Sequence, residues 1–217
     1  MSSSPHTIPS APSASPILVV NGLTTGHPGD EPVLRNWSAT IGAGLALIHA
    51  DSGCGKTTLL KALTGSLPVS TGVIRVAGRA ATPQQDFFLA DASAPVFDDL
   101  SPAECATRLW GEDQAADPGA WLEAAKALGL EPHLGKKMFM LSNGSRRKVA
   151  LAAGLVSSRP VVMFDEPTAA LDMPSIREFW RLLTDAAARR PSQAFIVASY
   201  EQPPALAGAP IVELPPR

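Results

Sequence analysis

The fold of this chain is decided by one stretch, Ala50-Asp51-Ser52-Gly53-Cys54-Gly55-Lys56-Thr57-Thr58. It follows the apolar run Leu45 to Ile48 and opens a helical pattern at Lys56. Glycine adopts positive φ without steric cost, so Gly53 and Gly55 allow backbone N–H groups to turn inward around phosphate oxygens. The N-terminus of the following helix adds partial positive charge. A strand, a glycine-rich loop and a helix in this order predict a phosphate-binding loop, or P-loop.

The P-loop interpretation assigns roles to neighbouring residues. Lys56 is expected to reach the β- and γ-phosphates of a nucleotide, and the Thr57 hydroxyl to coordinate Mg²⁺. The residues expected to contact the nucleotide are Ser52, Gly53, Cys54, Gly55, Lys56, Thr57 and Thr58. Ala50 stands where the pattern G-x-x-x-x-G-K-[ST] has glycine, a change without cost where φ is negative. The alternative, a chance glycine-rich turn, is disfavoured by the flanking strand and helix patterns.

The two cysteines of the chain are Cys54, inside the loop, and Cys105. So few in a chain of this length predict no disulfide framework and indicate a reduced, cytosolic setting. We interpret Cys54 as a small filler residue. The alternative is a thiol whose pKa is lowered by Lys56 and the helix N-terminus. In both cases we expect alkylation of Cys54 to block nucleotide binding.

Composition limits the possible functions of the chain. Its 217 residues suit one generous domain, and a formal net charge of −2 provides no basic footprint for nucleic acid. No apolar run approaches the ~18 residues of a membrane span, and no basic residue precedes an apolar run at the N-terminus. We therefore expect that any role at a membrane is exercised through another chain.

The order of apolar runs and helical patterns indicates an α/β domain over 17–217 with a mainly parallel sheet. Residues 1–16 are rich in Ser and Pro and predict a disordered tail. Strands are expected at 17–20, 44–49, 72–76, 161–164, 194–199 and 211–214. Helices are expected at 56–64, 102–110, 118–128, 146–157 and 174–189. The segment from about 100 to 158 lacks strand patterns and is predicted to form a helical subdomain.

A second chemical motif lies at the end of the apolar run Val161 to Phe164, which is followed by Asp165 and Glu166. Ligands of open α/β sheets bind beyond the carboxyl ends of the strands, so both carboxylates are expected to face the phosphates. Asp165 suits water-mediated Mg²⁺ coordination, and Glu166 suits polarising an attacking water. Alone this strand end is a weak signal, but together with the P-loop it predicts a hydrolytic site.

Further motifs resemble those of ATP-binding cassette (ABC) proteins. Leu141-Ser142-Asn143-Gly144-Ser145 and the helical pattern after it look like the family's signature motif. Asp165-Glu166-Pro167-Thr168 and Ala169-Ala170-Leu171-Asp172 resemble its extended Walker B motif and D-loop. The resemblance covers about 17–214. It implies a P-loop NTPase core of ABC type, with an N-terminal antiparallel β part and a short helical subdomain.

The resemblance also implies partners. Two cassettes of the family dimerise head to tail around two ATP molecules, so Ser142 and the N–H of Gly144 would contact the γ-phosphate bound by the other subunit. This second cassette would form a homodimer or a heterodimer. The resemblance further implies an ATPase subunit of a transporter, with transmembrane permease subunits on separate chains. Such a subunit is cytoplasmic and lies peripherally on the cytoplasmic face of the inner or plasma membrane.

The chain departs from the family at the γ-phosphate. Tyr200 stands where the family usually has a histidine, and a phenol donates a hydrogen bond but is never cationic near neutral pH. We therefore expect ATP binding with slow hydrolysis, with Tyr200 in the catalytic set. The family's Mg²⁺-sensing glutamine maps to Asp91 or Ala92. Gln84 and Gln85 stand earlier in the chain and are the alternative if the register of the alignment shifts.

Two further positions are interpreted from the same comparison. The aromatic residue that stacks on adenine maps to His27, for which a plain surface-loop histidine is the alternative. The cations at 146–148 could suggest a nucleic-acid patch. A solvated first helical turn, with one residue pairing locally, is the preferred interpretation.

Two other functions compete with transport. A non-transport ABC ATPase would act in a regulatory role or on nucleic acid or ribosomes. The short spacing from Lys56 to Ser142 leaves no room for the coiled coil of DNA-repair relatives, and translation-factor relatives carry two cassettes per chain. A different P-loop enzyme, such as a small-molecule kinase, would leave the signature and D-loop patterns unexplained.

Overall fold

The computed structural model describes residues 16–215, and the predicted tail lies outside them except for Pro16. The strands are β1 (Leu18–Thr25), β2 (Leu34–Ile41), β3 (Gly44–His49), β4 (Val69–Val76), β5 (Arg79–Ala80), β6 (Phe87–Leu89), β7 (Val161–Asp165), β8 (Ala194–Ser199) and β9 (Ile211–Glu213). The α-helices are α1 (Lys56–Leu63), α2 (Pro83–Asp86), α3 (Pro102–Trp110), α4 (Pro118–Ala127), α5 (Asn143–Val156) and α6 (Met173–Arg189). Short 3₁₀ helices are η1 (Pro95–Phe97), η2 (Glu131–His133), η3 (Met138–Met140) and η4 (Pro204–Leu206).

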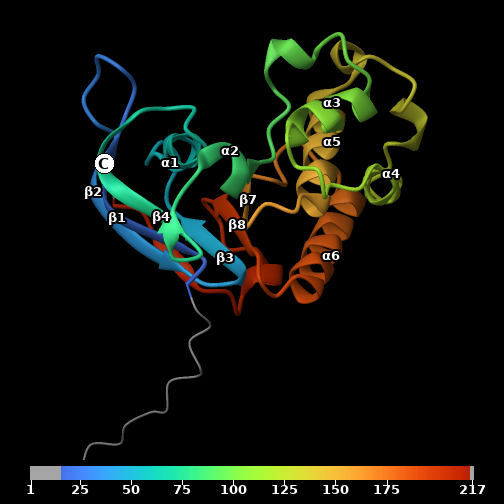
Figure 1. Ribbon diagram of the computed structural model, residues 1–217. Coiled ribbons are helices and arrows are strands. Elements are labelled where there is room, and N and C mark those ends of the chain that lie inside the picture. Colours follow the sequence, from blue (N-terminus) through green and yellow to red (C-terminus); the bar gives the residue numbers. More distant parts are fainter. Residues whose placement is uncertain (1–15, 216–217) are drawn as a thin grey trace, which may run out of the picture.

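The strands form two sheets (Figure 1). One has five strands in the order β6-β7-β8-β3-β9, and its neighbours pair in parallel. The other has four strands in the order β2-β1-β4-β5 and is antiparallel. The expectation of a mainly parallel sheet with an N-terminal antiparallel part is confirmed.

The central strands of the parallel sheet are apolar up to their last residues, as expected where both faces are covered. On β8, Phe195 and Val197 pack in one cluster with residues of α3 to α6, while Ile196 packs in a second cluster with α1 and the antiparallel sheet. Figure 1 shows α5 and α6 on one side of β7 and β8, and the antiparallel sheet on the other. The carboxyl ends of β3, β7 and β8 are therefore left free to build a site.

The sequence patterns missed three strands, β2, β5 and β6. The buried residues of β2 are Leu34, Trp37 and Ile41, which are three and four positions apart, because the β1–β2 ladder contains register shifts. This spacing hides the alternation that marks a half-buried strand. β5 and β6 are also missed, because they have only two and three residues.

Three α-helices, α3 to α5, lie between β6 and β7 with no strand among them in residues 16–215. Two indole N–H groups join α3 and α4 to α5. Trp110 of α3 donates to the Ala153 carbonyl at 3.1 Å, and Trp121 of α4 donates to the Val149 carbonyl at 3.4 Å. α5 begins at Asn143, three residues before the predicted start, because the Ser142 side chain accepts a hydrogen bond from the Ser145 N–H and caps the helix. Across residues 16–215, every helix is too short or too polar to cross a lipid bilayer.

Candidate active site

The P-loop connects β3 to α1, and its two glycines have the conformation that the sequence predicts. Gly53 has φ 83° and Gly55 has φ 98°, both in the left-handed region that favours glycine. A side chain at Gly55 would also meet Val33 Cγ1 at 2.7 Å. Ala50 is buried and has no positive φ, so alanine fits where the pattern has glycine. Cys54 is buried in the apolar cluster beneath the loop, as a filler residue would be.

Lys56 is 7% exposed and its ammonium lies inside the loop. Its Nζ donates to the carbonyl of Ala50 at 2.7 Å and to that of Asp51 at 3.1 Å. It also forms an ion pair with Glu166 Oε1 at 3.3 Å. The P-loop lysine and the carboxylate at the end of β7 are thus brought together, although they are far apart in the sequence.

Thr57 and Asp165 form the second contact across the site. The Thr57 hydroxyl donates a hydrogen bond to Asp165 Oδ2. Burial raises the pKa of Asp165, and the hydrogen bond from Thr57 opposes that rise only in part. A hydroxyl and one carboxylate suit Mg²⁺, which usually takes few protein ligands and completes its shell with water and phosphate oxygens. In the described part of the chain, no cluster of three or more His, Cys, Asp or Glu side chains is arranged for a metal.

Glu166 occupies a turn that several groups hold in place. Its φ of 42° is positive, an unfavourable conformation for a residue with a side chain. The Glu166 N–H donates to the Ala198 carbonyl at 2.9 Å, and the Glu166 carbonyl accepts a hydrogen bond from the Arg147 guanidinium. Its carboxylate accepts hydrogen bonds from Ser199 Oγ and from the Tyr200 N–H, each at 3.1 Å. The strained turn is therefore fixed from α5 and from β8.

Tyr200 and His27 lie differently from the P-loop residues. Tyr200 contacts Glu166 through its backbone, while its side chain is 55% exposed. His27 lies in the exposed turn between β1 and β2, where its carbonyl accepts from the Asp30 N–H at 3.1 Å. Within residues 16–215 the His27 ring makes no hydrogen bond to the P-loop. The remaining loop residues are placed as follows: Ser52 is exposed and Thr58 is half-buried.

The signature segment lies at the start of α5. Ser142 Oγ accepts from the Ser145 N–H at 3.2 Å, so this hydroxyl caps the helix. A Cβ at Gly144 would clash with the Ala170 carbonyl oxygen, so the D-loop backbone approaches the helix more closely than any side chain would allow. Across residues 16–215 neither Ser142 nor Gly144 makes a hydrogen bond to the P-loop of its own chain.

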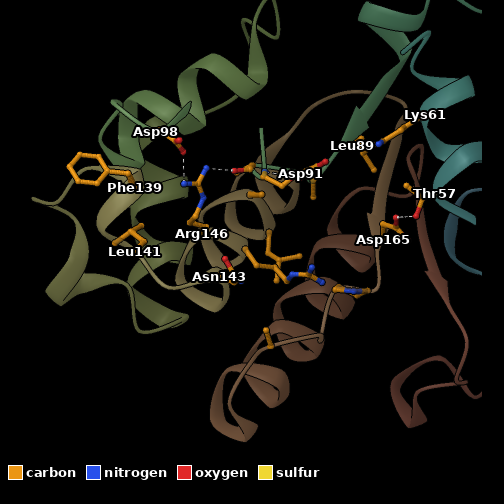
Figure 2. Close-up of a pocket in the computed structure, with 18 residues that line it drawn as sticks. Thr57, Lys61, Leu89, Asp91, Asp98, Phe139, Leu141, Asn143, Arg146 and Asp165 are labelled. Carbon is orange, nitrogen blue, oxygen red and sulfur yellow. Dashed lines mark hydrogen bonds and ion pairs between the residues drawn. The ribbon is translucent and has the colours of Figure 1, made fainter. Parts of the chain in front are cut away.

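A cavity of about 760 Å³ separates these two halves. Thr57 and Asp165 line it on one side, and Asn143 and Arg146 on the other (Figure 2). Asp91 and Ala92 also line it, whereas Gln84 and Gln85 line a different cavity of about 490 Å³. The 91–92 segment, to which the Mg²⁺-sensing glutamine is predicted to map, thus lines the cavity shared with Thr57 and Asp165.

The prediction of a solvated first turn in α5 is wrong. Arg146 forms an ion pair with Asp98 Oδ1 at 2.6 Å and donates to the Ala92 carbonyl at 3.1 Å. Arg147 reaches the Glu166 carbonyl, and the largely buried Lys148 pairs with Asp172 Oδ2 at 3.1 Å. All three partners are distant in sequence, so the run of cations at the start of the helix cannot predict these contacts.

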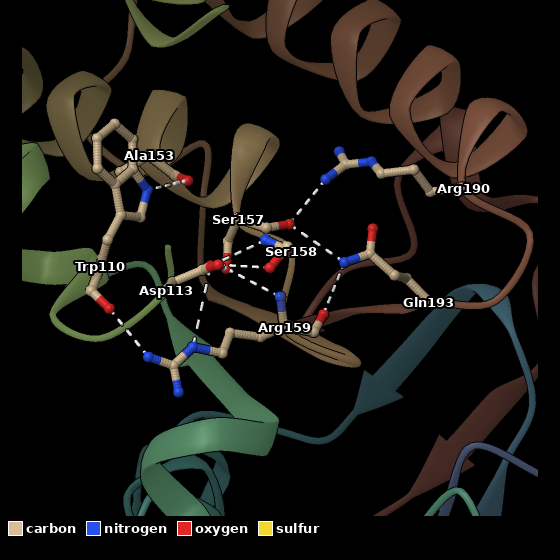
Figure 3. Close-up of polar contacts among 8 residues, drawn as sticks. All are labelled: Trp110, Asp113, Ala153, Ser157, Ser158, Arg159, Arg190 and Gln193. Atoms are coloured by element: carbon tan, nitrogen blue, oxygen red, sulfur yellow. Dashed lines mark hydrogen bonds and ion pairs between the residues drawn. The ribbon is translucent and has the colours of Figure 1, made fainter. Parts of the chain in front are cut away.

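Asp113 joins the helical part to the start of β7 (Figure 3). Its carboxylate, whose side chain is 2% exposed, accepts from Ser157 Oγ at 2.8 Å and from the Ser158 N–H at 2.9 Å. Burial would raise the pKa of Asp113, but these hydrogen bonds outweigh burial and lower it. Gln193 extends the joint to β8, because its Nε2 donates to the Ser157 carbonyl at 3.1 Å.

The family model described as "ABC transporter" matches residues 34–169. The chain is 31% identical to the cytochrome c biogenesis ATP-binding export protein CcmA of Rhizobium meliloti, over 91% of this chain and 97% of that protein. It is 34% identical to the hemin import ATP-binding protein HmuV of Streptomyces coelicolor, over 91% of this chain and 76% of that protein.

Solved structures share the fold. A putative ABC transporter ATP-binding protein from Pyrococcus furiosus superimposes with a TM-score of 0.72 at 24% identity, covering 91% of this chain and 96% of that chain. A dimeric bacterial ABC transporter cassette superimposes with a TM-score of 0.77 at 20% identity, covering 91% and 94%. The match covers both sheets and the helical part together.

Proposed function

The chain belongs to the ABC transporter family as an ATP-binding subunit, and from this membership we infer how its active site is completed. It is an ATPase that serves a transporter whose membrane subunits are separate chains. The two relatives named above have transport names, and they give no support to a regulatory or nucleic-acid-associated role. We propose that the site uses Mg²⁺ and a second cassette, and that it hydrolyses ATP slowly.

One observation carries this proposal: Lys56 with Glu166, and Thr57 with Asp165, meet at the carboxyl ends of β3 and β7. When ATP binds, the Lys56 ammonium would give up its hydrogen bonds to the loop carbonyls and donate to the β- and γ-phosphates instead. Glu166 would orient and polarise the attacking water, since its carboxylate is already held by Ser199 and Tyr200. Thr57 and Asp165 would hold Mg²⁺, which when bound neutralises phosphate charge. The remaining loop residues from 52 to 58 would surround the phosphates, and His27 would face the adenine.

A second cassette is proposed because the signature residues do not reach the P-loop of their own chain. Ser142 and Gly144 lie at the N-terminus of α5, where unpaired N–H groups and the helix dipole favour an anion. A cavity separates them from Thr57 and Asp165. Head-to-tail pairing would place this terminus on the γ-phosphate held by the partner cassette. The partner is a second copy of the chain or a related cassette.

The membrane subunits are proposed to contact an apolar patch formed by Val96, Phe139 and Met140. These residues are 62%, 60% and 58% exposed. The two segments that carry these residues are joined, because the Phe139 N–H donates to the Asp98 carbonyl at 3.0 Å and ties η3 to the residue after η1. Exposed apolar patches mark interaction sites. Contact through this patch would place the chain peripherally on the cytoplasmic face of the membrane.

ATP-dependent dimerisation of Glu166→Gln tests the sandwich arrangement. Loss of the general base is expected to slow hydrolysis by about 10²- to 10⁴-fold while ATP still binds, so the closed dimer should accumulate. Light scattering with and without ATP and Mg²⁺ measures the dimer, and Lys56→Ala is the control that should stay monomeric. A Glu166→Gln variant that binds ATP but remains monomeric would count against the arrangement.

A further inference from the structure

His49 is the last residue of β3, directly before the P-loop, and none of the roles above uses it. The strand register places it beside Ser199 of β8 and Glu213 of β9. Three strand ends therefore lie in one row at the edge of the sheet that carries the active site. The residue after Ser199 is Tyr200, whose N–H donates to Glu166.

The His49 ring contacts an acceptor at each of its nitrogens. Nδ1 lies 3.1 Å from Glu213 Oε2, and Nε2 lies 3.1 Å from the Tyr200 carbonyl oxygen. A carboxylate and a carbonyl accept hydrogen bonds and cannot donate them. Both contacts are hydrogen bonds only when both ring nitrogens carry protons. The geometry therefore matches the imidazolium form of His49.

The Tyr200 peptide connects this ring to the catalytic carboxylate. Its carbonyl accepts from His49 on one side, and its N–H donates to Glu166 Oε1 at 3.1 Å on the other. The side chain of His49 is 34% exposed and that of Glu213 is 65% exposed, so the ion pair itself contributes little stability. Its effect is on position rather than on folding.

We propose that His49, as an imidazolium, is a positioning residue that holds the Tyr200 N–H on the Glu166 carboxylate and makes ATP hydrolysis sensitive to pH. The proposal rests on the proposed role of Glu166. When the ring loses a proton, the remaining proton stays on Nδ1 beside the Glu213 carboxylate, which is a stronger acceptor than a carbonyl. Nε2 then becomes an acceptor facing the Tyr200 carbonyl oxygen, and that contact is lost. The Tyr200 segment then no longer holds Glu166 in one orientation.

Other charged groups lie on the elements around β3. α6 packs against β3, and its Arg181 pairs with Glu178 and Asp185 of the same helix. Glu213 comes from β9, Tyr200 and Glu201 follow β8, and Asp51 follows β3 itself. η4, which packs against β3, carries no titratable side chain. Among these groups, only Glu213 pairs its charge with the ring. Glu213 is therefore the group whose removal should shift the titration of His49.

NMR titration of the histidine rings tests the geometry without ATP. The chain has four histidines, and the His49 signals are assigned by their loss in His49→Gln. Between pH 5 and 8, where imidazole changes charge, we expect a doubly protonated ring at the acid end. Glu213→Gln should move the transition to lower pH, because the imidazolium loses its carboxylate. A His49 ring that stays neutral throughout, or a transition unchanged in Glu213→Gln, would overturn the proposal.

Steady-state kinetics then tests the effect on Glu166. We expect kcat to fall about two- to tenfold as His49 deprotonates, the range of one hydrogen bond, with KM for ATP unchanged. This limb of the pH profile should be absent in His49→Gln and present in the control His133→Gln. A limb that persists in His49→Gln excludes the positioning role. Absence of ATPase activity at every pH would instead contradict the proposed function, and the NMR result would still decide the geometry of the ring.

Discussion

Tyr200 offers the site two separate groups, its backbone N–H and its side-chain ring. Its backbone N–H holds Glu166, and its half-exposed ring is free to approach a γ-phosphate. The backbone contribution survives any substitution except proline. A substitution at Tyr200 therefore changes only the side chain that can approach the phosphate. Variants at this position measure the contribution of that side chain.

Tyr200→Phe is expected to lower turnover by about two- to tenfold, because one hydrogen bond to the transition state is lost. Tyr200→His should raise turnover, because an imidazole supplies a donor that can be cationic near neutral pH. Steady-state ATPase rates of the purified chain, alone and with its membrane partner, measure both. Thermal unfolding should be unchanged in either variant, since the ring is half exposed. Fast wild-type turnover that is indifferent to Tyr200→Phe would refute slow hydrolysis through this residue.

Gly144→Ala is expected to separate α5 from the D-loop. The new Cβ would clash with the Ala170 carbonyl oxygen, which is backbone and cannot rotate away. We expect a loss of about 1–3 kcal/mol in the free energy of unfolding, typical of overpacking, and weaker ATP-dependent dimerisation. Denaturant titration measures the first and light scattering the second. Gly135→Ala is the matched control, because nothing lies within 4 Å of its Cβ position. Equal stability of the two variants would contradict the close approach.

The residues that could be predicted from the sequence lie in contiguous motifs. Lys56, Thr57, Asp165 and Glu166 each follow a recognisable strand end, and parallel strands bring their carboxyl ends together. The residues that hold these side chains in place belong to no contiguous sequence motif. His49 and its partner Glu213 are 164 positions apart, and only the strand register makes them neighbours.

At the scale of elements, the joint formed by Asp113 holds α3, α5 and β7 in one arrangement. Asp113→Asn is expected to lower the free energy of unfolding at pH 7 by about 1–3 kcal/mol, the cost of weakened buried hydrogen bonds. The pKa of Asp113 is lowered in the folded state, so folding favours its ionised form. This stabilisation is fully present above the unfolded pKa of about 3.9 and is lost as the pH falls through the lower folded value.

Denaturant unfolding of Asp113→Asn and wild type between pH 7 and 3 measures this dependence. The difference between the two proteins should shrink as the pH falls. Asp99→Asn is the control, since Asp99 is exposed and makes no side-chain hydrogen bond or ion pair in the described residues. A difference that stays constant down to pH 3 would show that the carboxylate charge has no part in the joint.

Helices and strands differ in how far the sequence predicts them. α3, with its Ser101 cap and Glu104 completing a capping box, is found with its predicted bounds. β2 is missed because its bulged register breaks the alternation of buried residues. The start of α5 is displaced because Ser142 serves both as a signature residue and as the helix cap.

For the whole molecule, the apolar patch predicts how the chain meets its membrane partner. Changing Val96, Phe139 and Met140 together to Ser should abolish co-purification with the membrane subunits and leave ATP binding intact. Val73→Ser, on the antiparallel sheet, removes another exposed apolar residue, which is 49% exposed, and should have no effect. A patch variant that still co-purifies would place the partner on a different surface.

The three cations at the start of α5 have a consequence for motion. Arg146 is bonded to the segment before α3, Arg147 to the Glu166 peptide, and Lys148 to the cap of α6. These attachments reach three separate segments of the chain, so a rotation of α5 would break one of them or displace the segment that it holds. Arg147 would pass a displacement of the helical part to the Glu166 peptide, whose φ is positive. α5 would in this way couple movement of the helical part to the carboxylate that is proposed to polarise the attacking water.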